Sequence, residues 1–232
     1  MLCTIHRLGV IGYGEAYQLQ LELCRRRLNG EIPDAVLLLE HPPTVTVGKT
    51  GKLDNVLVSP DELKANGVSL FFTDRGGDVT YHGPGQLVIY PILDLRERNR
   101  DVHAYVHDLE EVVVRTLSKM GLRSNRQSHS GVWIGEEQIA AIGIAIKHWI
   151  TMHGIALNIK PQEDYFRLIN PCGMAGVPVT SVNALIGREV PLEEISEIVI
   201  SEFQAIFGLE TIEPRDYTLS SLLPSASGGM DA

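Results

Sequence analysis

The sequence predicts one α/β domain built on a mixed β-sheet with flanking helices. Apolar, β-branched runs typical of strands alternate irregularly with amphipathic segments typical of helices, and some of the strands follow one another closely enough to form hairpins. A doubly wound parallel sheet would instead alternate strand and helix regularly. The chain of 232 residues, 44% of them hydrophobic, is long enough to bury a large core without disulfide bonds.

In the first half of the chain, apolar runs and turn residues define the expected elements. The expected strands lie at 2–10, 35–41, 44–48, 68–73 and 86–92. A first helix is expected over 13–28, where apolar side chains recur at helical spacing before the stop at Gly30. A second helix, over 59–67, has Ser59 as its N-cap. Between the last two strands, the segment RGGDVTYHGPG at 75–85 is expected to be a glycine-rich loop.

The second half of the chain contains the clearest helix, over 101–120, whose apolar stripe ends at Gly121. The segment 131–147 predicts two strands around a turn, and 154–159 continues the β-rich character. A last helix is expected from Pro191 to Gly208. The Ser/Gly-rich end predicts a disordered tail at 213–232, which leaves 1–212 as the folded domain.

Charge and composition exclude several classes of partner. With 20 Lys and Arg against 29 Asp and Glu, the net charge of -9 argues against general nucleic-acid binding, which requires a basic face. An acidic partner would need a local basic patch. Arg115, Lys119 and Arg123 are one candidate patch, at the end of the long helix, and an ordinary solvated helix face is the alternative. No run approaches the roughly 20 apolar residues of a membrane span.

The three cysteines, Cys3, Cys24 and Cys172, form no CxxC pair and no zinc-finger spacing, so neither disulfides nor a metal site is expected. The first residues lack a basic segment followed by a long apolar run, as a signal peptide would have. The expected location is therefore the cytoplasm.

Two segments that are expected to be loops contain side chains that can take part in catalysis. Cys172 lies in INPCGMAGVP, a segment without apolar periodicity, so it is either a reactive thiol activated by nearby cations or N–H groups, or a buried structural thiol. The glycine-rich segment at 75–85 places Arg75 and His82 beside flexible backbone, which suits recognition of a carbonyl, phosphate or thioester oxygen; a tight connection between strands is the alternative. His153 is either a satisfied core histidine or a supporting catalytic group.

Four segments taken together resemble one family. RGGDVTYHGPGQLVIYPI, AAIG, WITMHGIALNI and NPCGM, in this order, closely resemble the octanoyltransferase family of lipoate biosynthesis, also called lipoyl(octanoyl) transferase or lipoate-protein ligase B, over roughly residues 5–208. The resemblance implies the catalytic-domain fold of biotin and lipoate protein ligases. It also implies transfer of an octanoyl group from acyl carrier protein to a lysine of the lipoyl domains of 2-oxoacid dehydrogenases and of the glycine cleavage H protein, without a cofactor.

The resemblance also assigns roles to individual residues. Cys172 matches the nucleophile that forms an acyl-thioester intermediate. The residues that match the walls of the substrate site are Arg75, Gly76, Gly77, Asp78, Val79, Thr80, Tyr81, His82, Ala141, Ile142, Gly143, Gly154, Ile155 and Ala156. Oxyanion stabilisation is expected from backbone N–H groups near Cys172, with His82 or His153 in support.

One position departs from the family pattern. Members generally carry a lysine before the IAAIG run, which lowers the pKa of the cysteine and serves in acid–base steps; here that position is Gln138. A neutral amide can donate a hydrogen bond to a thiolate but supplies no charge. Lys147 is offset by nine residues, which in a regular strand places it on the opposite face; a bulge or bend would bring it to the same face. His82 or His153 is the other candidate replacement base.

Three outcomes of this substitution stay open: a working enzyme with a replacement base, a slow enzyme, or a chain that binds acyl carrier protein and lipoyl domains without turnover. A further alternative is an ATP-dependent lipoate or octanoate ligase, which shares the fold. The sequence lacks the ligase-type GRGRxGR loop, and its YHGPGQ segment favours the transferase.

Overall fold

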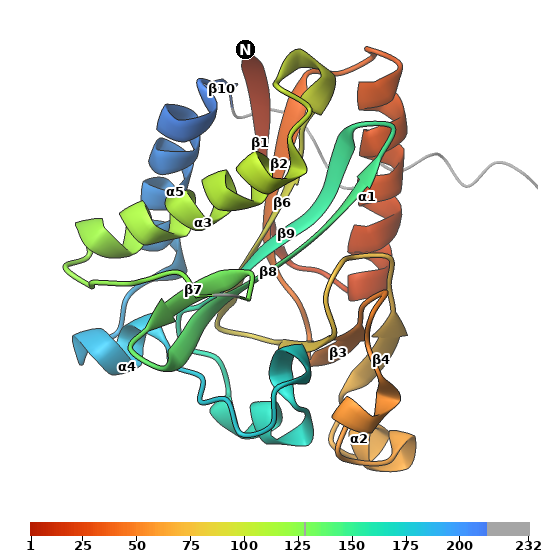
Figure 1. Ribbon diagram of the computed structural model, residues 1–232, viewed down its shortest axis with the longest axis vertical. Coiled ribbons are helices and arrows are strands. Elements are labelled where there is room, and N and C mark those ends of the chain that lie inside the picture. The colour runs from red at the N-terminus through yellow and green to blue at the C-terminus, as the bar shows by residue number, and fades with distance from the viewer. Residues whose placement is uncertain (128, 213–232) are drawn as a thin grey trace, which may run out of the picture.

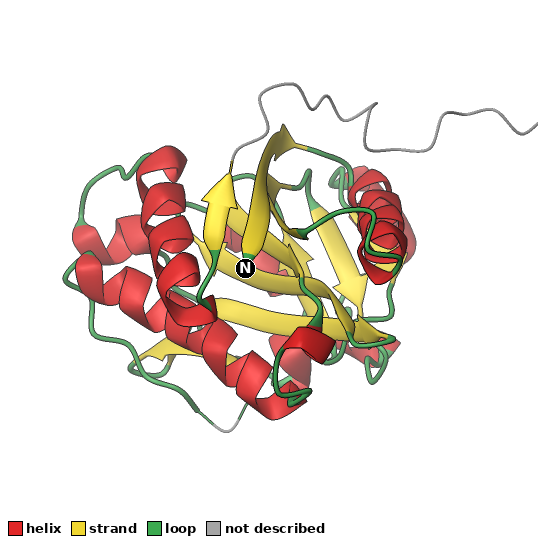
Figure 2. Cartoon of the chain, turned by 90° about the horizontal axis from the view of Figure 1, so that it is seen from above, coloured by secondary structure: helices red, strands yellow, loops and turns green. Residues whose placement is uncertain are grey.

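The computed structural model describes residues 1–127 and 129–212, and it contains two sheets (Figures 1 and 2). The large sheet has seven strands in the order β10-β1-β2-β6-β9-β8-β7, and the small one has three in the order β4-β3-β5. The strands of the large sheet are β1 (Leu2–Val10), β2 (Asp34–Glu40), β6 (Gln86–Ile92), β7 (Gly131–Ile134), β8 (Glu137–Lys147), β9 (Ile150–Asn158) and β10 (Glu210–Ile212). Those of the small sheet are β3 (Thr44–Val47), β4 (Ser69–Phe72) and β5 (Val79–His82).

The predicted mixed sheet is confirmed, because β1 pairs in parallel with β2 and β10, whereas β2, β6, β9, β8 and β7 pair antiparallel in turn. The α-helices are α1 (Tyr13–Leu28), α2 (Pro60–Ala65), α3 (Val102–Lys119), α4 (Val182–Ile186) and α5 (Leu192–Phe207). In Figure 1, α3 and α5 lie on one side of the large sheet and α1 lies on the other.

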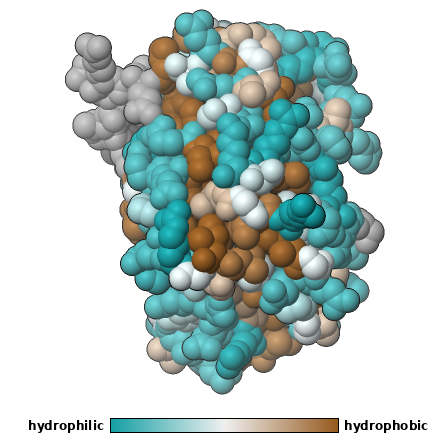
Figure 3. Space-filling model, turned by 90° about the vertical axis from the view of Figure 1, so that its left-hand side faces the viewer, coloured by the Kyte–Doolittle hydropathy of each residue, from teal (hydrophilic) through white to brown (hydrophobic). Residues whose placement is uncertain are grey.

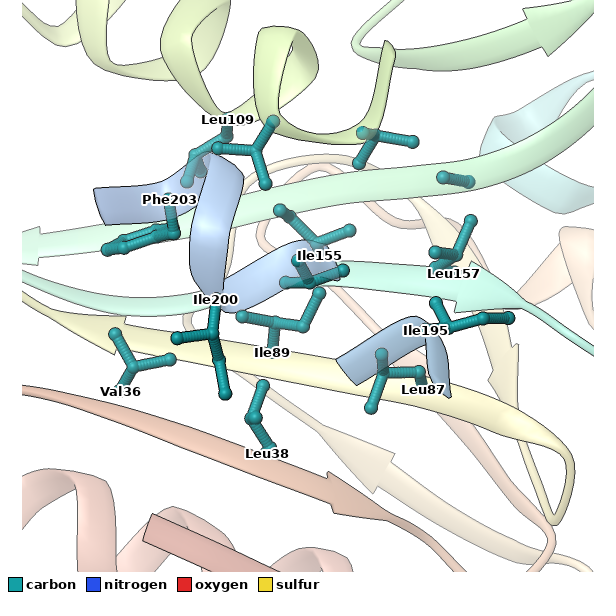
Figure 4. Close-up of a cluster of buried hydrophobic side chains, with 14 of the residues drawn as sticks. Val36, Leu38, Leu87, Ile89, Leu109, Ile155, Leu157, Ile195, Ile200 and Phe203 are labelled. Atoms are coloured by element: carbon teal, nitrogen blue, oxygen red, sulfur yellow. The ribbon is translucent and has the colours of Figure 1, made fainter. Parts of the chain in front are cut away.

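The central strands are buried on both faces, which explains their continuous apolar runs. In β2, Val36 and Leu38 pack in the core under α3 and α5, while Leu37 and Leu39 pack in the core under α1. Figure 4 shows side chains of β2, β6 and β9 meeting those of α3 and α5, with Phe203 among them. Burying each such side chain contributes about 2 kcal/mol.

The helix limits follow from local signals in the sequence. The side chain of Ser59 accepts a hydrogen bond from the Glu62 amide, and the two residues form a capping box at the start of α2. The carboxylate of Asp101 caps α3 by accepting from the amides of His103 and Ala104. Gly208 ends α5 with a left-handed φ of 62°.

Two expectations about the strands were wrong. The segment 75–85 is not all loop, because Val79–His82 forms β5 and pairs antiparallel with β3. β9 begins at Ile150, earlier than 154, because it pairs with β8 in a hairpin as far as Lys147. In each case the pairing partner, which is distant or unmarked in the sequence, decides the element.

Figure 3 shows hydrophobic side chains gathered over the middle of the face that lies at the left in Figure 1, with hydrophilic ones around them. No helix within the described ranges has the length and apolar character needed to cross a bilayer. The predicted tail at 213–232 lies outside the described residues.

Candidate active site

A cavity of about 460 Å³ lies where the small sheet meets the β8–β9 hairpin. Its wall contains almost every residue that the sequence singled out. Of those, Arg75, Gly76, Gly77, Asp78, Val79, Thr80, His82, Ala141, Ile142, Gly143, His153, Gly154, Ile155, Ala156 and Cys172 line it. Further lining residues that the sequence did not indicate include Tyr13, Thr50, Tyr90, Val106, His129, Ser130 and Ile144.

Strand pairing brings these distant segments together. In the β8–β9 hairpin, Ala141 lies opposite Ala156 and Gly143 lies opposite Gly154. The amide of Gly76 donates to the Ile144 carbonyl at 2.8 Å, which ties the glycine-rich segment to β8. Gly154 must lack a side chain, because a Cβ there would lie 2.3 Å from the Ile89 carbonyl oxygen on the neighbouring strand. Small residues thus leave the space that the cavity occupies.

Tyr81 is the exception among the predicted wall residues and a correction to the sequence analysis. Side chains alternate along β5, so Thr80 and His82 face the cavity while Tyr81 points into the core of the small sheet. There its ring stacks on Tyr165 with 5.3 Å between centroids. Its hydroxyl lies where a Cβ on Gly83 would be, which accounts for glycine at that position.

Cys172 sits on a strained turn. It lies in the short 3₁₀ segment Pro171–Gly173 with φ 56° and ψ 21°, a left-handed conformation that a non-glycine residue adopts at a cost of roughly 1–2 kcal/mol. The turn packs against Asp78, since a Cβ on Gly173 would lie 2.6 Å from Asp78 Oδ2. The Asp78 carboxylate is itself held by the Lys52 amide at 3.0 Å and by Asn55 Nδ2 at 2.8 Å. This packing holds the thiol in the cavity wall.

Gln138 lies directly beside the thiol, although it does not line the cavity. Its Nε2 donates to Cys172 Sγ at 3.8 Å. Its backbone is fixed by two hydrogen bonds with the segment after the cysteine: Gln138 N donates to Pro178 O at 2.9 Å, and Thr180 N donates to Gln138 O at 3.0 Å. The position expected to hold the family lysine therefore holds a neutral donor at hydrogen-bonding distance from sulfur.

Burial raises the pKa of the Cys172 thiol above its ordinary value. The Gln138 hydrogen bond and the charge of Arg75 both act to lower the pKa of this thiol, and the Asp78 carboxylate acts to raise it. Burial raises the pKa of the two core thiols further, to about 12 for Cys3 and about 11 for Cys24. Cys172 is half-buried in the cavity wall, whereas Cys3 and Cys24 are buried in the core.

Arg75 is a buried cation with neutral partners only. Its guanidinium donates to Thr46 O at 2.8 Å, Thr46 Oγ1 at 2.9 Å, Asp78 O at 2.9 Å and Gly76 O at 3.0 Å. Across the described parts of the chain, no carboxylate pairs with it. Burial lowers the pKa of Arg75, but the group is always charged at working pH. Its charge therefore stays available to the cavity and to Cys172.

Three glycines from separate segments make room for this guanidinium. Cβ atoms built on Gly48, Gly77 and Gly143 would lie 2.9, 3.4 and 3.6 Å from Arg75 Nη1. The sequence motif indicates Arg75 as a wall residue but does not indicate its electrostatic relation to Cys172. The sequence signal for this relation is an arginine within a glycine-rich segment. The glycines that frame the guanidinium are far apart in the chain, so the sequence does not show them together.

The two candidate bases differ in their surroundings. His82 Nδ1 lies 2.8 Å from Gln86 Oε1, and the Gln86 amide donates to Tyr81 O and Asn158 Oδ1, so His82 donates from Nδ1 and keeps Nε2 as an acceptor. Burial lowers the pKa of His82 well below its ordinary value. Within residues 1–127 and 129–212, no hydrogen bond joins either His82 or His153 to Cys172.

His153 is held by a carboxylate. Its Nε2 lies 2.9 Å from Asp74 Oδ1, and Asp74 Oδ2 in turn pairs with Lys147 Nζ at 2.9 Å. Its Nδ1 is buried without a hydrogen-bond partner, and its φ of 57° is left-handed. Burial lowers the pKa of His153, and Asp74 acts against that shift. Lys147 pairs with Asp74 and, like Gln138, does not line the cavity. The β7–β8 pairing shifts register opposite Gln138–Ala140, so β8 is not the regular strand that the prediction about Lys147 assumed.

In the described part of the chain, no three His, Cys, Asp or Glu side chains converge in a way that could hold a metal ion. The chemistry that this arrangement offers is that of a thiol beside an amide donor and a buried cation, facing a mostly apolar cavity.

The chain is similar to known proteins along most of its length. The sequence matches the family described as Lipoyl protein ligase A/B catalytic domain over residues 12–204. An octanoyltransferase of Solibacter usitatus is 46% identical over 211 residues, which cover 90% of this chain and 95% of that protein. An octanoyltransferase of Desulforamulus reducens is 43% identical over 212 residues, which cover 90% and 93%.

Solved structures show the same fold at low sequence identity. A lipoate-protein ligase A bound with ATP has a TM-score of 0.77 and 17% identity, covering 96% of this chain and 93% of that one. Biotin protein ligase from Aquifex aeolicus in complex with biotin and ATP has a TM-score of 0.55 and 12% identity, covering 88% and 70%. The predicted catalytic-domain fold of lipoate and biotin ligases is thereby confirmed.

Proposed function

The chain belongs to the octanoyltransferase family, and we propose that it carries an octanoyl group from acyl carrier protein to a lysine of a lipoyl domain through a thioester on Cys172. It is an acyltransferase that acts on octanoyl groups in protein lipoylation. The acceptors that we propose are the lipoyl domains of 2-oxoacid dehydrogenases and of the glycine cleavage H protein.

The observation that carries the proposal is Cys172 on its strained turn in the wall of a cavity that is otherwise largely apolar. Ala141, Ile142, Ile155 and Ala156 line that cavity from the facing strands of one hairpin. Each buried CH₂ group contributes about 0.8 kcal/mol, so an eight-carbon chain gains several kcal/mol there. Apolar walls of fixed shape suit an acyl chain of limited length.

In the first step the Cys172 thiolate attacks the thioester carbonyl of the donor. A new C–S bond forms to Cys172, the C–S bond to the carrier arm breaks, and the carrier leaves as a thiolate that takes up a proton. Exchange of one thioester for another is nearly balanced in free energy. The Gln138 amide, 3.8 Å from Sγ, and the charge of Arg75 favour the thiolate over the thiol.

In the second step the lysine amine of the acceptor attacks the acyl-Cys172 carbonyl. The C–N bond of the amide forms, the C–S bond to Cys172 breaks, and the amine gives up a proton. The greater stability of the amide drives transfer without ATP. His153 is the better-placed acceptor for that proton, because Asp74 holds its Nε2–H and leaves the buried Nδ1 without a partner.

The test is intact-protein mass spectrometry after mixing with octanoyl-acyl carrier protein. The unaltered chain and the Cys24→Ser control should gain one octanoyl group, and Cys172→Ser should gain none. Addition of a lipoyl domain should then move the group to the domain. An adduct that persists in Cys172→Ser would refute the proposed nucleophile. If no adduct forms but octanoate drives ATP–pyrophosphate exchange, the chain is a ligase. If neither an adduct nor exchange is seen, the chain is a binding protein.

A further inference from the structure

Within the described residues, the basic stripe indicated by the sequence keeps one unpaired cation, Arg123. Arg115 Nε pairs with Glu111 at 2.7 Å, and Lys119 Nζ pairs with Glu202 at 2.6 Å. These carboxylates neutralise two of its three cations. An acidic partner of a chain with net charge -9 therefore needs positive charge somewhere else on the surface.

The unpaired lysines gather in one stretch of chain. Of the six lysines, Lys119, Lys147 and Lys160 form ion pairs with carboxylates. The other three, Lys49, Lys52 and Lys64, are exposed and pair with no carboxylate in the described ranges. All three lie between the end of β3 and the end of α2, at the lower right in Figure 1. Lys49 and Lys52 belong to the part of that segment that borders the cavity.

This border, here called the rim loop and comprising residues 48–57, is fastened to the catalytic site. Lys49 N donates to Arg75 O at 2.9 Å, and Lys52 N donates to Asp78 Oδ1 at 3.0 Å. Thr50, between the two lysines, lines the cavity itself. At its far end, the Asn55 carbonyl accepts from Asn170 N at 2.8 Å, two residues before Cys172. A partner bound on the rim loop would hold its acyl arm at the cavity.

The rim loop also exposes apolar surface. Leu53 is 54% exposed and Leu57 is 52% exposed. Exposed leucines beside unpaired lysines suit an amphipathic partner surface that combines apolar and acidic side chains. Asp54 is the acidic side chain of the rim loop, so the lysines exceed the carboxylates there by one.

We propose that the rim loop is the docking surface for the acidic carrier protein that delivers the acyl thioester. This inference rests on the proposed function. The charges of the two substrates indicate which of them binds the rim loop. The carrier arm has a phosphate group, which Lys49 and Lys52 attract. The acceptor presents a lysine, which they repel. The rim loop therefore favours the donor, and binding of the lipoyl domain there is the outcome that would overturn the proposal.

The test compares two double charge reversals with equal change in net charge. Lys49→Glu/Lys52→Glu alters the rim loop, and Lys64→Glu/Arg123→Glu alters two exposed cations elsewhere. With octanoyl-acyl carrier protein as donor, the rim variant should raise KM about tenfold and the control should stay near the unaltered chain. With octanoyl-pantetheine, which is uncharged, both variants should acylate Cys172 at the unaltered rate.

A binding measurement separates this inference from the proposed function. Fluorescence anisotropy of labelled carrier protein should show about tenfold weaker affinity for the rim variant alone, and the affinity of the unaltered chain should fall as salt rises. Equal affinity of all three chains, or a loss of lipoyl-domain binding in place of carrier binding, would overturn the docking surface. Failure of both donors to acylate Cys172 would instead overturn the proposed function, while the anisotropy result would still decide the docking.

Discussion

Gln138 Nε2 lies 3.8 Å from Cys172 Sγ, and this contact joins the β8 strand to the turn that carries the thiol. The amide donates a hydrogen bond without adding charge. The charge near the thiol comes instead from Arg75, which reaches the cavity from the glycine-rich segment and has no carboxylate partner among the described residues. A lysine at position 138 would supply both a hydrogen bond and a positive charge to the thiol. Here Gln138 supplies the hydrogen bond and Arg75 supplies the charge.

Gln138→Lys should lower the pKa of Cys172, because it places a cation next to the sulfur at a position where Gln138 is only 4% exposed. The measurement is the pH profile of Cys172 alkylation by iodoacetamide, with the site identified by peptide mass spectrometry. Glu137→Gln, one position along the strand, changes the net charge by the same amount, so it is the matched control and should leave the profile unmoved. Equal shifts in both variants would mean that long-range charge, and not the contact, controls the thiol.

Arg75→Gln should raise the pKa of Cys172 and slow its alkylation near neutral pH, because it removes the cation that favours the thiolate. It should also reduce the free energy of unfolding by about 2–4 kcal/mol through lost hydrogen bonds. Thr46→Val separates these two effects, since it removes a hydroxyl that accepts from Arg75 and leaves the charge in place. It should lower stability in urea titrations without shifting the alkylation profile; a shift of similar size would show that packing controls the thiol.

The sequence predicted the elements whose first and last residues are determined by nearby residues. The limits of α1, α3 and α5 follow from apolar periodicity and terminal residues such as Asp101 and Gly208. It failed at β5, where glycines on both sides of Val79–His82 indicated a loop and the pairing with β3 decided a strand. Strand pairing depends on partners far away in the chain, and local composition does not record them.

The candidate site was predicted to the extent that family motifs mark it. The motifs indicate Cys172, Gln138 and the three lining segments. They do not indicate that Tyr81 faces the other way, because that depends on the register of β5. Nor do they pair Arg75 with the thiol, because Gly48, Gly77 and Gly143 frame the guanidinium only after the sheets have formed. These are properties of the packed structure.

The buried histidines should make the fold sensitive to mild acid. Burial lowers the pKa of His41 and of His6 to about 4, so the folded state binds fewer protons than the unfolded state between about pH 4 and pH 6.5. Stability is therefore complete above pH 6.5 and falls as the pH drops toward 4. At pH 5 each histidine should lower the free energy of unfolding by roughly 2 kcal/mol.

Urea denaturation at several pH values checks this expectation, with His41→Gln as the test variant. Between pH 7 and pH 5 the free energy of unfolding of that variant should fall less than that of the unaltered chain. The difference should be about the amount that protonation of one buried histidine contributes. An unchanged slope would show that His41, which lies 2.8 Å from the Ile11 carbonyl oxygen through Nδ1 and from the Tyr90 hydroxyl through Nε2, is protonated within the fold.

Gly48→Ala should destabilise the protein and disable the site together. A Cβ at this position would lie 2.3 Å from the Gly77 carbonyl oxygen and 2.9 Å from Arg75 Nη1, so the backbone that holds the guanidinium must shift. The expected loss is about 2 kcal/mol or more in the free energy of unfolding. Acylation of Cys172 should slow as well, because the same shift moves the charge of Arg75 relative to the thiol.

Gly14→Ala in α1 is the matched control with the opposite expected sign. Its Cβ would make ordinary contact with the Phe71 ring at 3.5 Å, and alanine favours a helix over glycine by about 0.5–1 kcal/mol. Urea denaturation and acylation kinetics of both variants check the pair. If Gly48→Ala kept both stability and acylation, the frame of glycines around Arg75 would not fix the guanidinium, and the thiolate would depend on Gln138 alone.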